Sequence, residues 1–365
     1  MKVEERIVRQ LKARIAIEVE ERGDGSLPEE SLLHEKIQGL MSVPPFFATN
    51  FLYCTEREFQ NVDWEVVTRR LKEEVMVRYD QGNGIVDDSE TYDKNWFSNL
   101  KLEKGAEFYY LNRFSEYYAE RLGPQVRYTI GQDTQSILDL CGAPDRKESR
   151  HIRGLIFGFV QSGKTINYLS VANAAMDSGY DMIVILAGAT NILRRQTQER
   201  LNRDLIGQLS GKIAGVGEIS FKDEKKPISL TTLKSDFNSN VAKAQMSGFT
   251  LHTTKTPVVA VLKKNVSPLK NLKQWLVQQA GGGLLEKSIL LIDDESDYAS
   301  VNTKEENDPT SINKGIREIL NVFSVSTYVA VTATPFANIL IDHEGNNEEQ
   351  GSDLFPRSFI WALDR

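Results

Sequence analysis

Five short apolar runs, alternating with segments of helical character, constrain the fold of this chain more than any other feature. They span Leu155–Phe159, Met182–Ala187, Val258–Leu262, Ser288–Ile292 and Tyr328–Val331. Strands that alternate with helices form a parallel sheet that is covered by helices on both faces. The sequence therefore predicts an α/β domain over residues 129–365.

The preceding residues, 1–128, have a different character and are predicted to be mostly helical. The predicted helices include Val3–Glu21, Trp64–Tyr79 and Glu107–Leu122. In the first of these, apolar residues recur at every fourth position from Ile7 to Val19, which makes one helix face. We therefore predict a helical N-terminal domain over 1–128, followed by the α/β domain with an irregular insertion at 207–254.

Composition excludes several classes of protein. The 365 residues are 40% hydrophobic and contain only two cysteines, Cys54 and Cys141. Two distant cysteines exclude a disulfide scaffold and a zinc site built on a cysteine pair, and they suit a reducing cytoplasm. No apolar run approaches the length of a membrane span. We therefore expect a cytoplasmic protein without a membrane partner.

The charge is unevenly distributed along the chain. The formal net charge is −7, but residues 191–275 contain 15 Lys or Arg against 6 Asp or Glu, a local balance of +9, which leaves −16 for the rest. Such asymmetry is compatible with a nucleic-acid surface on one part of the molecule. A solvated basic face without a partner is the alternative interpretation.

A phosphate-binding motif follows the first apolar run. Gly158–Thr165 reads Gly-Phe-Val-Gln-Ser-Gly-Lys-Thr, which matches G-x-x-x-x-G-K-[ST], and a predicted helix follows it. The backbone of such a loop cradles phosphates at the positive end of the helix. In this motif, Lys164 would reach the β- and γ-phosphates, and the Thr165 hydroxyl would bind Mg²⁺. The predicted cradle comprises Gly158, Gln161, Ser162, Gly163, Lys164 and Thr165.

An acidic cluster follows the fourth apolar run, in the sequence Asp293-Asp294-Glu295-Ser296-Asp297. Ligands of open α/β folds sit at the carboxyl ends of the strands, where this cluster would lie. We expect Asp294 to hold Mg²⁺ and Glu295 to polarise the attacking water. The spacing leaves Asp293 as an alternative metal ligand, and an acidic cluster of this kind can also serve only as a helix cap.

A third element, Val329–Pro335, is an apolar run that ends in Thr-Ala-Thr-Pro. The order of glycine loop, Asp-Glu-x-Asp and Thr-Ala-Thr resembles the first RecA-like lobe of superfamily 2 helicases and translocases. In that superfamily the last motif couples the nucleotide site to the nucleic-acid site. The resemblance implies that Thr332 and Thr334 hydrogen-bond Asp297 or neighbouring groups.

Further segments narrow the resemblance. They are Ile185–Gly188, Leu193–Leu201, Asp294–Thr303, Asp308–Asn313, Thr332–Ile339 and Leu354–Arg357. Together with the glycine loop, they are similar to the Z-one domain family of large bacterial proteins, described as endonucleases or helicase-like ATPases of restriction-type, phage-defence operons. The similarity covers about residues 120–365. It implies an ATPase that uses ATP and Mg²⁺, acts on DNA and has other defence-operon proteins as partners.

Other residues bear on the same interpretation. Arg194, Arg195, Arg200 and Arg203 recur at helical spacing after the second run, where related motors touch the nucleic-acid backbone. An upstream adenine-reading glutamine motif is not evident, although Gln132 and Gln135 are candidates. The chain ends at Arg365, before any second RecA-like lobe, so we expect an N-terminal fragment with very low activity.

Two other functions compete with the ATPase interpretation. A restriction-type nuclease needs paired carboxylates and a lysine, and the only tempting string, Glu224-Lys225-Lys226, has no matching strand. Any nuclease site would therefore lie beyond Arg365. Alternatively, the chain is a non-motor, ATP-dependent interaction protein whose acidic N-terminal helices bind another protein.

Overall fold

A computed structural model describes most of the chain. The described residues are 3–22, 30–75, 82–87, 92–104, 108–119, 121–122, 124–144, 149–158, 163–297, 300, 310–335, 338, 346–347 and 351–363. They form two compact units: residues 1–81 with 115–132, and residues 82–114 with 133–365.

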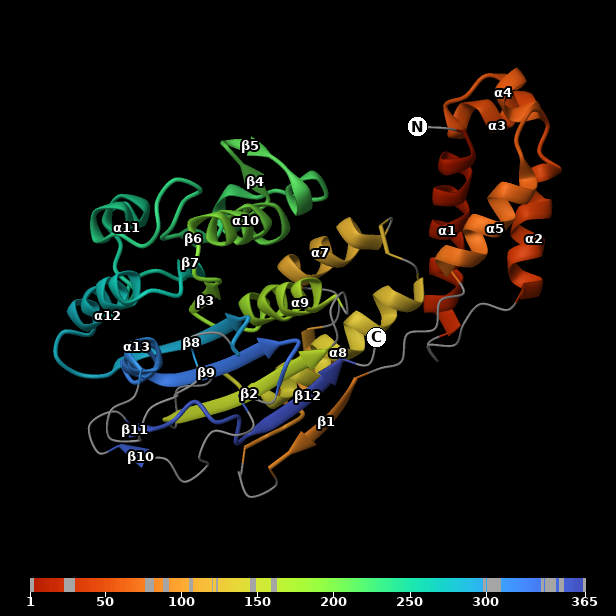
Figure 1. The fold of residues 1–365 in the computed structure, drawn as a ribbon. Coiled ribbons are helices and arrows are strands. Elements are labelled where there is room, and N and C mark those ends of the chain that lie inside the picture. Colours follow the sequence, from red (N-terminus) through yellow and green to blue (C-terminus); the bar gives the residue numbers. More distant parts are fainter. Residues whose placement is uncertain are drawn as a thin grey trace. The chain divides into compact units, whose positions relative to one another are not determined.

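The first unit is helical. Its helices are α1 (Val3–Arg22), α2 (Glu30–Met41), α3 (Pro45–Leu52), α4 (Glu56–Gln60) and α5 (Trp64–Val75). The predicted apolar face of α1 is buried, because Ile7, Leu11 and Ile15 are at most 1% exposed. Figure 1 shows α1, α2 and α5 alongside one another. Burial of one apolar stripe per helix is what stabilises such a unit.

The second unit contains all eight strands of the main sheet and its covering helices. Its further helices are α6 (Trp96–Lys104), α9 (Lys164–Asp177), α10 (Asn191–Leu201), α11 (Ser239–Met246), α12 (Val266–Ala280) and α13 (Ser311–Leu320). A π-helical turn, Asn202–Ile206, and two 3-10 turns, Gly215–Glu218 and Asp223–Lys225, lie between α10 and α11.

Two more helices cross the division between the units. They are α7 (Tyr109–Ala119) and α8 (Pro124–Leu140). Residues 82–114 group with the sheet unit because β1 (Asn83–Val86) pairs with its last strand. The boundary predicted after residue 128 therefore differs from the grouping in the structure.

Eight strands form a mostly parallel sheet in the order β1-β12-β2-β9-β8-β3-β7-β6. The strands are β2 (Arg150–Gly158), β3 (Met182–Ala187), β6 (Ile228–Ser229), β7 (Val258–Lys263), β8 (Leu285–Asp294), β9 (Phe323–Thr332) and β12 (Phe359–Leu363). Among the strand pairs of this sheet that the structure describes, only β1–β12 is antiparallel. The predicted α/β fold is present, and the described residues of all five predicted apolar runs lie on strands of this sheet, whereas Phe159 lies outside the described residues.

Small two-stranded ribbons lie outside the main sheet. They pair β4 (Gln208–Leu209) with β5 (Lys212–Ile213), and β10 (Asn346–Asn347) with β11 (Gly351–Ser352). The first belongs to the predicted insertion at 207–254, which contains short elements and turns. The sheet itself reaches this segment at β6.

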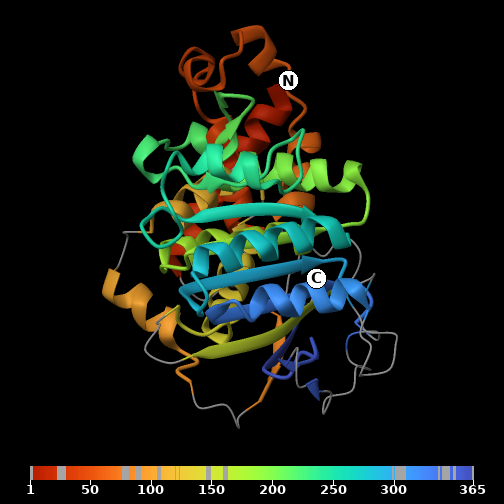
Figure 2. The ribbon, with the colours of Figure 1, turned by 90° about the vertical axis from the view of Figure 1, so that its left-hand side faces the viewer.

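The helices flank the central strands on both sides. Figure 2 shows α12 and α13 in front of the sheet. The β2–α9–β3 connection runs one way along the sheet, and the β7–α12–β8 connection runs back. Since such crossovers are right-handed, the two connections place α9 and α12 on opposite faces. The central strands are buried accordingly, and every residue of β3 and β9 is buried.

Candidate active site at the carboxyl edge of the sheet

The three sequence motifs meet at one edge of the sheet. The strand β2 ends at Gly158, β8 at Asp294 and β9 at Thr332. In the parallel register Phe157 lies opposite Thr332, and Asp294 lies opposite Val331. The carboxyl ends of these strands therefore come together, although the motifs lie far apart in the sequence.

The glycine loop leads directly into α9. Gly163 is the N-cap residue of this helix, has φ +73° and supplies no side-chain cap. Glycine adopts this left-handed conformation without the penalty that a Cβ would bring. A helix start of this kind presents backbone N–H groups to an anion. The predicted cradle residues Gln161 and Ser162 lie outside the described residues.

Lys164, the first residue of α9, reaches back to the last residue of β2. Its ammonium donates to the Gly158 carbonyl at 2.7 Å. Burial lowers the pKa of Lys164, while the negative charges of Asp294 and Asp297 act in the opposite direction. The ammonium is thus within electrostatic range of both carboxylates and also contacts the end of β2.

Tyr168 joins the loop helix to the acidic strand. Its hydroxyl donates to Asp294 Oδ2 at 3.1 Å and is also hydrogen-bonded to the Thr165 side chain. Burial raises the pKa of Tyr168 well above its ordinary value, so the hydroxyl keeps its proton. The two predicted metal ligands, Thr165 and Asp294, are therefore brought together around one phenol.

The two adjacent aspartates have different surroundings. Asp293 is fully buried, forms a 2.8 Å ion pair with Lys264 and accepts a 2.7 Å hydrogen bond from the Tyr328 hydroxyl. Asp294 is only partly buried, and burial raises the pKa of its carboxyl group. Because Asp293 is engaged by protein groups, Asp294 is the better placed of the two alternatives to meet a metal ion.

Glu295 is exposed and has an unusual backbone conformation. Its φ of +55° is left-handed, which non-glycine residues rarely adopt. Its amide donates to Asp294 Oδ1 at 3.1 Å, and its carboxylate lies against the backbone of Gly188 after β3. An ideal Cβ at Gly188 would lie 3.0 Å from Glu295 Oε2, so glycine makes room for this carboxylate.

Asp297 is held by the two threonines of the third motif. The Thr332 hydroxyl donates to Asp297 Oδ1 at 2.8 Å, and the Thr334 hydroxyl donates to Oδ2 at 2.5 Å. Burial alone would raise the pKa of Asp297, but these hydrogen bonds outweigh it and lower the pKa below its ordinary value. The expected hydrogen bonds are present, and the coupling role of these residues stays a prediction.

The four arginines of the predicted nucleic-acid contact are not equivalent. Arg194 is only 4% exposed, and its guanidinium donates to the carbonyls of Leu233 and Ser235. It therefore lacks the exposure that a phosphate contact needs, which corrects its inclusion in the set. Arg195, Arg200 and Arg203 are exposed, and Arg203 lies 3.6 Å from the carboxylate of Glu199 on the preceding turn.

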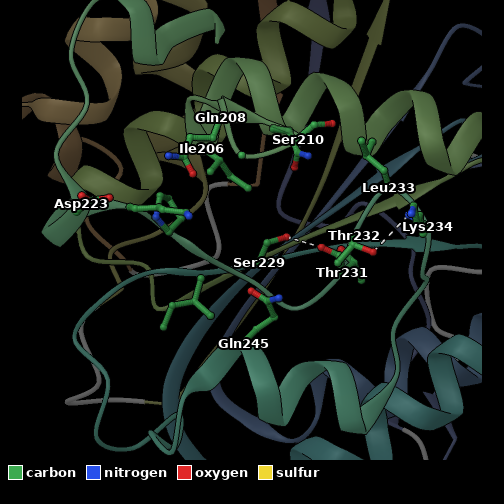
Figure 3. Close-up of a pocket in the computed structure, with 15 residues that line it drawn as sticks. Ile206, Gln208, Ser210, Asp223, Ser229, Thr231, Thr232, Leu233, Lys234 and Gln245 are labelled. Atoms are coloured by element: carbon green, nitrogen blue, oxygen red, sulfur yellow. Dashed lines mark hydrogen bonds between the residues drawn. The ribbon is translucent and has the colours of Figure 1, made fainter. Parts of the chain in front are cut away.

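A separate cavity of about 550 Å³ lies within the basic segment. Figure 3 shows Asp223 toward one side of it and Lys234 toward the other, with Thr231 and Thr232 between them. The Thr231 hydroxyl is engaged by Gln198 and by the amide of Val261. None of the motif residues that the structure describes lines this cavity. The adjacent string Glu224–Lys226 is exposed and includes no strand, so it gains no support as a nuclease motif.

Three residues of this edge escaped the sequence analysis. Tyr168 had a signal, because it lies one helical turn after Thr165 and faces the same side. Lys264 comes two residues after an apolar run, but its burial could not be read from the sequence. Gly188 appeared only as part of a motif string.

Two features, a cluster of metal-binding side chains and a membrane-spanning helix, are absent from the part of the chain that the structure describes. There, no three or more His, Cys, Asp or Glu side chains form a group that could hold a metal ion by themselves. Among the described helices, none combines the length and apolar character that crossing a bilayer requires.

No model of a known protein family matches the chain, and no curated protein matches it. The resemblance to the Z-one domain family therefore stays a prediction.

Proposed function

We propose that this chain is an ATP-binding and ATP-hydrolysing lobe of RecA-like type, belonging to a helicase- or translocase-like protein of superfamily 2 that acts on DNA. The observation that carries the proposal is the convergence of Lys164, the Thr165–Tyr168–Asp294 cluster and Asp297 at one sheet edge. The strand order adds support, because β2 and β8 are separated by one strand. Two strand spacings, about 10 Å, leave room for phosphates and a metal ion.

The residues present suit Mg²⁺ and ATP. Magnesium keeps several waters and binds to one or two protein oxygens together with substrate phosphates. The Thr165 hydroxyl and the Asp294 carboxylate offer that number of ligands, and Tyr168 orients both. The helix start at Gly163 and Lys164 suits the phosphates.

The chemistry of each residue follows from its surroundings. Bound Mg²⁺-ATP would supply the phosphoanhydride bond and a metal that neutralises charge on the phosphates. Lys164 would exchange its bond to the Gly158 carbonyl for phosphate oxygens. Glu295, an exposed carboxylate at this edge, would accept the proton of the attacking water. Asp297 and its threonines connect the ends of β8 and β9 and would transmit nucleotide occupancy.

The proposed DNA contact rests on charge. Arg195 and Arg200 are exposed on α10, which follows the carboxyl end of β3. Exposed arginines can displace counterions from phosphates, so the interaction would weaken as salt increases. A role in phage defence, and a nuclease site beyond Arg365 as the alternative, rest on the family resemblance alone.

A second candidate function, ATP-dependent protein interaction, is favoured by one observation on the helical unit. Phe46, Phe47 and Tyr53 are 64%, 61% and 85% exposed. Exposed aromatic side chains that cluster in a short segment are typical of protein contacts. Serine substitutions at Phe46 and Phe47 would leave ATP binding intact and would reduce co-purification of a partner expressed with the chain.

The test is ATP titration of the chain and of two lysine variants. We expect Lys164→Ala to abolish measurable Mg²⁺-ATP binding with little loss of stability. Lys263→Ala is the matched control, because it removes an ammonium from the same edge, where it contacts Asn191 at 2.9 Å. Unchanged affinity in Lys164→Ala, or equal losses in both variants, would refute the phosphate-cradle assignment.

A further inference from the structure

A buried lysine that follows β7 contacts the backbone of Glu295, which follows a different strand, β8. Lys264 follows β7, its side chain is fully buried, and its ammonium donates to the Glu295 carbonyl at 2.5 Å. The same ammonium lies 2.8 Å from Asp293 Oδ1. Since β3 lies between β7 and β8, the Lys264 side chain spans the carboxyl end of β3.

The Lys264 contact is reinforced from the other side. The Tyr328 hydroxyl on β9 donates to Asp293 Oδ2 at 2.7 Å. Three strands therefore contribute to one buried chain of polar contacts that ends on the Glu295 carbonyl. Burying two charges costs desolvation free energy, and the attraction between the charges offsets this cost only where the geometry is good and further hydrogen bonds are made.

The end point of this chain is the residue with the left-handed backbone. Glu295 has φ +55°, and its carboxylate lies against Gly188. Strained conformations of this kind persist only where the surroundings over-determine them, and they cluster at functional sites. A hydrogen bond to the carbonyl of the strained residue is such a constraint.

We infer that Lys264 is a positioning residue, which holds the backbone of Glu295 in its left-handed conformation and so aims the carboxylate over Gly188. This inference rests on the proposed role of Glu295 in ATP hydrolysis. Without Lys264 the turn would relax and the carboxylate would move away from the attacking water. A misplacement of about 1 Å can cost about 10²-fold in rate. ATP affinity depends on Lys164 and Thr165 and would not change.

A matched control exists at the opposite edge of the same sheet. Lys287 lies 2.8 Å from Asp181 Oδ1 and donates to the Thr254 carbonyl at 3.4 Å. It is also a largely buried lysine that bridges an aspartate and a carbonyl. Its partners Asp181 and Thr254 lie at the amino edge, at the other end of β8 from Glu295, so we expect loss of its charge to affect stability alone.

The experiment measures single-turnover ATP hydrolysis and ATP affinity with the 365-residue chain. Lys264→Met is made in the wild-type and in the Glu295→Gln backgrounds, beside Lys287→Met. We expect at least tenfold slower hydrolysis by Lys264→Met, with ATP affinity within threefold of wild type. In the Glu295→Gln background the same change should slow hydrolysis less than twofold. Lys287→Met should hydrolyse ATP within twofold of wild type.

Each other outcome has a meaning. A Lys264→Met variant that hydrolyses ATP at the wild-type rate, or that loses the same factor in both backgrounds, overturns the positioning role. If Lys264→Met does not fold, Lys264→Met combined with Asp293→Asn removes both buried charges and is held to the same expectations. Wild-type chain without turnover, or Glu295→Gln at the wild-type rate, overturns the proposed function, and this inference with it.

Discussion

The two edges of the sheet carry the same kind of lysine–aspartate pair in very different settings. At the amino edge, Asp181 accepts hydrogen bonds from the amide and hydroxyl of Ser288 at 2.9 and 3.0 Å, and its other oxygen meets Lys287. At the carboxyl edge, the pair of Asp293 and Lys264 adjoins a left-handed glutamate. The Asp181–Lys287 pair belongs to a group of hydrogen-bonded residues with ordinary backbone conformations. The Asp293–Lys264 pair instead contacts a residue, Glu295, whose backbone is strained.

The two edges of the sheet use their buried polar groups for different purposes. The amino-edge pair joins the start of β8 to the residue before β3, which stabilises the sheet. The carboxyl edge collects carboxyl groups whose pKa values are shifted in opposite directions, raised for Asp294 and lowered for Asp297. Perturbed titration together with backbone strain is typical of functional sites.

The largest expected change in hydrolysis rate distinguishes two glutamates at opposite ends of β8, Glu295 and Glu286. Glu295→Gln should slow ATP hydrolysis by about 10²–10⁴-fold and keep ATP affinity, because the amide cannot accept a proton from water. Glu286→Gln, near the amino end of β8 and also exposed, should change neither. Phosphate release and ATP titration measure both. Equal rates for the two variants would remove the functional distinction between the edges.

A smaller effect is expected from added volume at the carboxyl edge. The Cβ of Gly188→Ala would lie 2.5 Å from Leu193 Cδ1 and 3.0 Å from Glu295 Oε2. Leu193 is partly exposed and can move, so stability should fall by about 1 kcal/mol. Hydrolysis should fall by about tenfold because the carboxylate must shift.

The control for Gly188→Ala is Gly283→Ala, which precedes β8. Nothing lies within 4 Å of an added Cβ there. Urea unfolding and phosphate release should show no change for this control. A Gly188→Ala variant as active as Gly283→Ala would show that the Glu295 carboxylate does not act from its position over Gly188.

Reversing two positive charges should weaken DNA binding more at the carboxyl edge of the sheet than at the amino edge. Arg195→Glu with Arg200→Glu should weaken binding and reduce the salt slope of log affinity by about two, about one for each phosphate that is no longer neutralised. Lys226→Glu with Lys255→Glu makes the same charge change before β6 and β7, at the amino edge. Fluorescence anisotropy at several salt concentrations compares the pairs, and equal losses of affinity would point to a non-specific charge effect.

Arg194 should behave differently from its neighbours on α10. Its buried guanidinium donates to two carbonyls, so Arg194→Ala should lower the urea midpoint and leave the salt slope of DNA binding unchanged. A reduced salt slope in a folded Arg194→Ala variant would restore this residue to the contact set.

The weakest effect that we expect is a pair of opposite pH dependences. The lowered pKa of Asp297 means that its contribution to stability is present above its unfolded pKa, about 3.9, and is lost as pH falls through the folded value. Asp297→Asn should therefore be less stable than wild type at pH 7, and the difference should shrink on acidification.

Asp294 should show the reverse sign. Its raised pKa means that its charged form opposes folding at neutral pH, so Asp294→Asn should be the more stable protein at pH 7. That advantage should disappear as pH falls through the folded pKa. Urea midpoints between pH 7 and pH 3 test both variants, and the same sign for both would contradict the assigned surroundings.

Local sequence was sufficient to predict five strands of the main sheet and the helix after the glycine loop, whereas β1, β6 and β12 were not predicted. Their signals are continuous apolar runs, a glycine motif, and a glycine after the helix at position 179, which has φ +98°. β3 spans the residues predicted, Met182–Ala187, and β7 extends the predicted run by one residue. Each motif at a strand end was also recognisable, because a motif that directly follows a strand in the sequence lies at the end of that strand whatever the strand order in the sheet.

Which groups at those ends face a ligand depends on the tertiary structure. Adjacent residues of a strand point to opposite faces, so sequence could not tell whether Asp293 or Asp294 would be engaged by Lys264 and Tyr328. The burial of Arg194 depends on a loop about 40 residues further along the chain. Likewise, the bond from Lys264 to Glu295 needs three strands in one register. Such contacts join distant segments, and their energies depend on burial that no single segment encodes.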